Sequence, residues 1–67
     1  MIDITVNGDA MSLTEGTTIS DLIHKMELAG QRIAIELNMD VIPRSEHEQK
    51  ILSAGDEVEV VRAIGGG

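Results

Sequence analysis

The sequence contains no cysteine, no phenylalanine, no tyrosine and no tryptophan, and it has a single proline. Without cysteine the chain has no disulfide framework and no thiolate metal site. Without aromatic residues its core must be aliphatic, and nine Ile, five Val, five Leu and four Met are present to build it. Sixty-seven residues make one small domain, near the lower limit for folding on a hydrophobic core alone.

Basic residues are also scarce, since five Lys and Arg stand against twelve Asp and Glu, for a formal charge of −7. This balance argues against nucleic acid as a partner, because phosphates select basic surfaces. An acidic surface suits either plain solubility or steering toward a basic protein partner. The sequence has neither an N-terminal basic and apolar leader nor an apolar run of membrane length, so we expect a cytoplasmic protein without membrane contact.

The first half of the chain reads as a hairpin followed by a helix. Residues 2–6 alternate apolar and polar side chains, Asn7–Gly8 is a tight-turn signal, and the alternation resumes through Leu13. The period then changes to that of a helix, with one apolar face that consists of Ile19, Leu22, Ile23, Met26 and Ala29. Thr18 and Asp21 form a capping box at its start, and Gly30 is expected to cap its end.

The second half returns to strands. Residues 33–37 alternate again, and a turn over residues 38–40 leads to a short strand that Pro43 favours as an edge strand. Ser45 and Glu48 form a second possible capping box, enough for one helical turn. A last strand follows from Glu57.

The expected order is therefore β-β-α-β-β, a short helical turn and β, which is an α+β fold with a sheet packed on one main helix. Residues 1–64 are expected to form the domain, and residues 65–67 a flexible glycine tail. The predicted core includes Ile4, Val6, Leu13, Leu22, Ile23, Met26, Ile35, Val58 and Val60.

The titratable residues do not form a recognisable catalytic or metal-binding pattern. His24 lies on the polar side of the predicted helix, and His47 lies between two glutamates without a second histidine at helical spacing. Glu57 and Glu59 share one strand face and most simply keep it hydrated. We therefore expect no metal, no cofactor and no enzymatic activity of the chain's own.

The three glycines at positions 65–67 directly follow the last predicted strand. A cloning remnant or simple fraying is one explanation. The functional explanation is that residues without side chains can enter a narrow channel of another protein, with Gly65 and Gly66 threading it. They would also leave the carboxylate of Gly67 open for attack on a nucleotide phosphate.

Several motifs together carry a resemblance to a known family. These are "VNGD" from Val6, "VIPR" from Val41, "GDEVEVV" from Gly55 and "IGGG" from Ile64. With them in register over essentially the whole chain, the sequence resembles the ThiS family of ubiquitin-like sulfur carriers. The resemblance implies the β-grasp form of the α+β fold, with the first and last strands as parallel neighbours at the centre of the sheet.

What this resemblance implies for function is a sulfur carrier of thiamine biosynthesis that borrows its catalysis. An enzyme similar to ubiquitin-activating enzymes would use ATP to adenylate the carboxylate of Gly67. Sulfur from a cysteine desulfurase persulfide would displace AMP to give a thiocarboxylate, and a thiazole synthase would receive that sulfur. Val61, Arg62 and Ile64 are the expected partner surface, although a lone exposed valine at position 61 is also ordinary.

Other functions remain open at this point. A related carrier of the molybdopterin synthase small-subunit type would share the fold and the thiocarboxylate, although such chains are typically longer and lack "VIPR". A β-grasp interaction module without covalent chemistry belongs to a different class.

Overall fold

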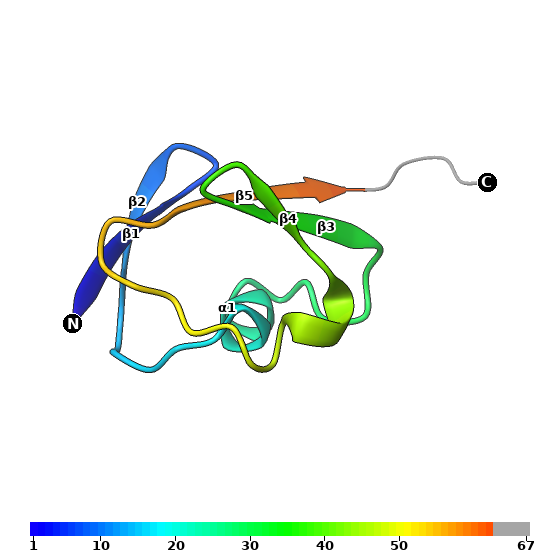
Figure 1. Ribbon diagram of the computed structural model, residues 1–67, viewed down its shortest axis with the longest axis horizontal. Coiled ribbons are helices and arrows are strands. Elements are labelled where there is room, and N and C mark those ends of the chain that lie inside the picture. Colours follow the sequence, from blue (N-terminus) through cyan, green and yellow to red (C-terminus); the bar gives the residue numbers. More distant parts are fainter. Residues whose placement is uncertain (63–67) are drawn as a thin grey trace.

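The computed structural model describes residues 1–62, which form one five-stranded sheet packed on one helix (Figure 1). The elements are β1 Ile2–Val6, β2 Asp9–Leu13, α1 Ile19–Lys25, β3 Ile33–Leu37, β4 Asp40–Ile42, the 3-10 turn η1 Arg44–Glu46, and β5 Glu57–Arg62. This is the predicted order. Among the described residues, no helix has the length and apolar character needed to cross a membrane.

The sheet has the strand order β2-β1-β5-β3-β4, so the first and last strands are central neighbours. β1 and β5 run parallel, while the pairs β1–β2, β3–β4 and β3–β5 are antiparallel. The prediction of a parallel central pair is confirmed, and so is the edge position of the strand before Pro43. β5 is therefore held between the two hairpins of the chain.

The core fills the space between the inner face of the sheet and α1. Six residues of the predicted core are buried: Ile4, Val6, Leu13, Leu22, Ile35 and Val58. The other three predicted core residues, Ile23, Met26 and Val60, are partly buried and pack against them. Four further apolar residues are buried: Ile2, Ile19, Leu37 and Leu52.

α1 begins as predicted but ends earlier. The Thr18 hydroxyl accepts from the Asp21 N–H, and the Asp21 carboxylate accepts from the Thr18 N–H, so the capping box is present. The prediction that Gly30 caps the helix is wrong. The helix ends at Lys25 and Glu27 takes the left-handed position with φ 60°, while the Leu28 N–H donates to the carbonyl of Ile23 in a Schellman arrangement.

The loop between β4 and β5 closes the start of the helix. Its carbonyls at His47 and Lys50 accept from the N–H groups of Ser20 and Ile19 at 2.9 and 3.0 Å. The predicted capping box of Ser45 and Glu48 is wrong, because η1 begins after Pro43 and has no side-chain cap. The single helical turn itself is present.

Candidate functional site

The candidate site is built on β5, since this central strand leads toward the glycines that the sequence singles out. Val61 and Arg62 are its last two residues, and both are exposed. The other predicted site residues, Ile64 and Gly65–Gly67, lie outside the described residues. The predicted tail boundary at residue 65 lies there too.

Two asparagines in left-handed turns hold β5 from its two sides. Asn7, with φ 52°, donates its N–H to the Val58 carbonyl at 2.9 Å, and its Oδ1 accepts from the Val60 N–H at 2.8 Å. Asn38, with φ 51°, donates its N–H to the Glu57 carbonyl, and its Oδ1 accepts from the Glu57 N–H at 2.9 Å. Asn tolerates this backbone region better than most residues, which explains its use at both turns.

The outer face of the sheet is not covered by any helix of the described residues (Figure 1). Val61 lies on this face directly opposite Ala34 of β3 and is 48% exposed. Val41 on β4 is 67% exposed, and Met39 in the adjacent turn is 89% exposed. Val61 therefore points outward from the sheet. Its role in partner binding stays a prediction.

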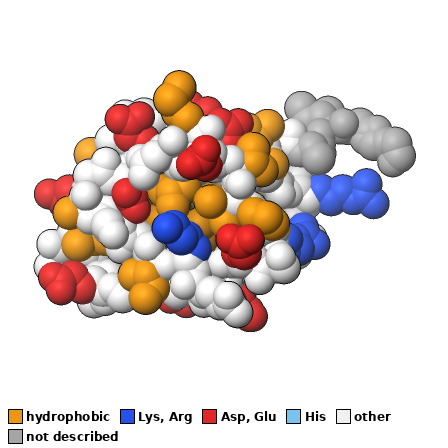
Figure 2. All heavy atoms as spheres, in the orientation of Figure 1, with side chains coloured by type: hydrophobic (Ala, Val, Ile, Leu, Met, Phe, Trp, Pro, Cys, Tyr) orange, Lys and Arg blue, Asp and Glu red, His pale blue; other side chains and the backbone are white. Residues whose placement is uncertain are grey.

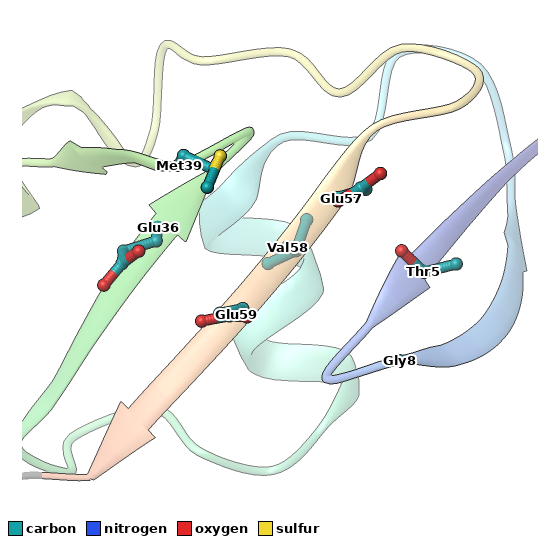
Figure 3. Close-up of a pocket in the computed structure, with 7 residues that line it drawn as sticks. All are labelled: Thr5, Gly8, Glu36, Met39, Glu57, Val58 and Glu59. Atoms are coloured by element: carbon teal, nitrogen blue, oxygen red, sulfur yellow. The ribbon is translucent and has the colours of Figure 1, made fainter.

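Acidic side chains occupy the middle of the same face. Glu36 lies directly opposite Glu59, and Glu57 is two residues before Glu59 on β5. Together with Thr5 and Met39, which Figure 3 shows with them, these glutamates line a pocket of about 210 Å³. The space-filling view in Figure 2 shows acidic side chains scattered over the visible face, with basic side chains both near its centre and beside the end of β5.

Neither histidine belongs to this face. His24 is exposed on α1, as predicted from the helical period. His47 is only 7% exposed, and its Nε2–H donates to the Ile42 carbonyl at 3.0 Å, a structural role that the sequence did not reveal. Within residues 1–62, no three His, Cys, Asp or Glu side chains are grouped so that they could hold a metal ion. In residues 1–62 the outer face of the sheet is the surface on which Val61, the predicted partner residue, is exposed.

Comparison with protein families identifies the chain. The model of the ThiS family matches residues 4–67, which includes the three glycines. The chain belongs to the ThiS family.

Individual relatives agree with this assignment. The sulfur carrier protein ThiS of Escherichia coli is 27% identical over 98% of this chain and 100% of its own length. The crystal structure of the thiamine biosynthesis protein ThiS from Geobacter metallireducens superposes with a TM-score of 0.85 at 28% identity, over 98% of this chain and all of that one. The ubiquitin-like β-grasp fold of ThiS proteins is therefore confirmed for this chain.

A different kind of relative is much longer. A thiazole synthase of Magnetococcus marinus is 34% identical to this ThiS-family chain over 64 residues, which are 96% of this chain. The chain spans only 20% of the length of the thiazole synthases that it matches. In those proteins a ThiS-like segment is thus part of the same polypeptide as a larger remainder.

Proposed function

We propose that this protein is a sulfur carrier for thiamine biosynthesis and that its reactive group is the carboxylate of Gly67. The observation that carries the proposal is the family match, which runs from the first strand through the three glycines. The similarity to the sulfur carrier protein ThiS of Escherichia coli supports the same function.

The proposed chemistry has three steps, and partner proteins catalyse each of them. A carboxylate oxygen of Gly67 attacks the α-phosphorus of ATP, and pyrophosphate leaves. A persulfide sulfur derived from a cysteine desulfurase then attacks the acyl carbon, and AMP leaves. A second thiol cleaves the resulting acyl disulfide, which gives a disulfide and the thiocarboxylate of the carrier.

The first step requires a nucleotide site that the carrier does not provide in its described part. A phosphate cradle needs a glycine-rich loop that leads into a helix N-terminus, or a nest of backbone N–H groups. In residues 1–62 the one α-helix begins with its first donors already bonded to Asp21 and to the carbonyls of residues 47 and 50. We therefore assign ATP binding and magnesium to an adenylating enzyme similar to ubiquitin-activating enzymes.

A thiazole synthase is the proposed sulfur acceptor. Its support is the match between nearly all of this chain and a segment of longer proteins that are named thiazole synthase. Joining two partners in one polypeptide raises their effective concentration, which favours domains that act in succession.

Mass spectrometry of the intact protein, isolated from its own cells, tests the proposal. We expect a fraction of the molecules to carry the mass increase of one oxygen-to-sulfur exchange, located at Gly67 by fragmentation. Alkylation of that fraction by a thiol reagent is the control, because the chain has no cysteine that could react. A protein that is never sulfur-modified, even when the pathway is active, would contradict the carrier function.

A further inference from the structure

Among residues 1–62, no strand pairs with the β1-facing flank of β5 in the second half of β5. On its other flank β5 pairs with β3 all the way to Arg62, which lies opposite Ile33. On the β1 side, pairing ends where Val6 meets Val58. β1 stops there because Asn7 turns into the left-handed region and the chain reverses into β2.

The direction of each backbone group along β5 follows from the hydrogen bonds that β5 makes to Asn7 and Asn38. The Val58 carbonyl and the Val60 N–H both bond to Asn7, so residues 58 and 60 present their backbone groups toward β1. Glu57 bonds to Asn38 on the opposite side, through both its N–H and its carbonyl. Since backbone groups alternate along a strand, Arg62 also faces the β1 side.

The Asn7 side chain makes one of the hydrogen bonds to β5 that a longer β1 would have made. Its Oδ1 takes the Val60 N–H at 2.8 Å, in the place where a longer β1 would have offered a carbonyl. Beyond it, the Val60 carbonyl and the N–H and carbonyl of Arg62 have no strand of the described residues beside them. Figure 3 shows β5 continuing past the turn at Gly8 with β3 on one flank only.

We propose that this flank of β5, from the Val60 carbonyl through Arg62, is where the adenylating enzyme adds an extended backbone segment to the carrier's sheet. The inference rests on the proposed function and adds the kind of contact through which the partner binds. Unpaired strand groups in a row are a template for another strand, and proteins use such edges for recognition by strand addition.

The position of this flank favours the activating enzyme as the occupant. It lies at the end of β5, within five residues of Gly67 in the sequence, so a partner segment paired with it would bind close in sequence to the proposed reactive group. The exposed Val61 points outward from the same stretch of β5, and the two contacts would therefore reinforce each other. The backbone groups of Val60 and Arg62 can form only a few hydrogen bonds with a partner strand. We therefore expect strand addition to determine the register and orientation of the partner more than its total affinity.

Hydrogen exchange of the 15N-labelled carrier, measured alone and with saturating adenylating enzyme from the same genome and ATP, is the decisive test. We expect the Arg62 amide to exchange fast in the free carrier and to become protected in the complex. The Val61 amide is the internal control, since it faces β3 and should be protected in both states. Fast exchange of Arg62 in the complex would overturn the proposal.

A pair of substitutions at one position gives the second measurement. Arg62→Pro removes the N–H from the free flank without touching the bonds to β3, because Arg62 and Ile33 are a non-hydrogen-bonded pair. Arg62→Ala removes the same side chain and keeps the N–H. We expect Arg62→Pro to bind the enzyme about 2- to 12-fold more weakly than Arg62→Ala, as the loss of one backbone hydrogen bond predicts.

The other outcomes of these experiments distinguish a failure of the strand addition from a failure of the proposed function. Equal affinities of the two variants would overturn the strand addition. Protection of Arg62 that grows with carrier concentration alone would make a second copy the occupant and would also overturn it. If the wild-type carrier supports no pyrophosphate exchange with the enzyme, the proposed function fails; if it does and Arg62 stays unprotected, only this inference fails.

Discussion

Glu36 and Glu59 face each other across β3 and β5 on the outer side of the sheet. Like charges directly opposite in a sheet are destabilising by a few tenths to about 1 kcal/mol. The chain therefore carries an unfavourable pair at the centre of the face that we assign to partner binding. A pair of this kind is consistent with a face whose sequence is selected for more than folding.

Neutralising one member of this pair is expected to stabilise the protein. Glu36→Gln or Glu59→Gln should each raise the free energy of unfolding by about 0.2–1 kcal/mol. The double variant should gain less than the sum, because the first substitution already removes the repulsion. Urea unfolding at low salt measures this. Glu48→Gln, on an exposed residue outside the sheet, controls for the general reduction of negative charge. Strict additivity would show that the two carboxylates do not interact.

The Asn7 side chain is expected to contribute more to the free energy of unfolding than an ordinary turn residue does. Asn7→Gly keeps the left-handed backbone and loses the acceptor for the Val60 N–H, so it should lower the free energy of unfolding by about 0.5–1.5 kcal/mol. Asn7→Asp keeps an acceptor oxygen and should retain protection of the Val60 amide in hydrogen exchange. Equal loss of that protection in both variants would contradict the role of Oδ1.

His47 gives a third prediction, with His24 as its matched control. His47→Leu removes the donor to the Ile42 carbonyl at a buried position and should lower the free energy of unfolding by about 1–3 kcal/mol. His24→Leu changes an exposed helical residue and should stay within about 0.5 kcal/mol of the wild type. Both values follow from urea unfolding at neutral pH. Similar values for the two variants would show that the His47 bond contributes no net stability.

The strands could be predicted from the sequence because their alternation is regular and their turns carry clear signals. Asn7–Gly8 gave the first hairpin, and the alternation of Ile33, Ile35 and Leu37 gave the face that β3 buries. The capping box at Thr18 and Asp21 was equally local. Each of these features depends on residues within a few positions of one another.

The features that could not be predicted lack a local signal in the sequence. Glu27 ends the helix in a left-handed conformation that glycine would normally take, so the position of Gly30 did not indicate where the helix ends. Leu52 is buried although it lies in a loop, because that loop crosses the start of α1. The bond from Val60 to Asn7 joins residues 53 positions apart, and no local pattern indicates it.

Val61, on the outer face of the sheet, gives a fourth prediction. Val61→Asp should weaken binding to the adenylating enzyme about tenfold or more, because it replaces apolar contact with a charge that must be desolvated. The melting temperature should change little, since the side chain is 48% exposed. Ala10→Asp, on the exposed strand β2 at the far edge of the same sheet, is the control for added charge. Unchanged affinity for Val61→Asp would place the docking surface elsewhere.

The last prediction concerns Gly67, the proposed site of chemistry. The reference pKa of a C-terminal carboxyl is about 3.3–3.7, so at neutral pH this group is ionised and can act as a nucleophile toward ATP. The carrier alone with ATP should release no pyrophosphate, whereas with its adenylating enzyme it should support exchange of pyrophosphate into ATP. Removal of Gly67, or addition of one bulky residue after it, should abolish that exchange while urea unfolding stays unchanged. An extended variant that mass spectrometry shows to be uncleaved, and that still supports exchange and sulfur transfer, would exclude the carboxylate of Gly67 as the reactive group.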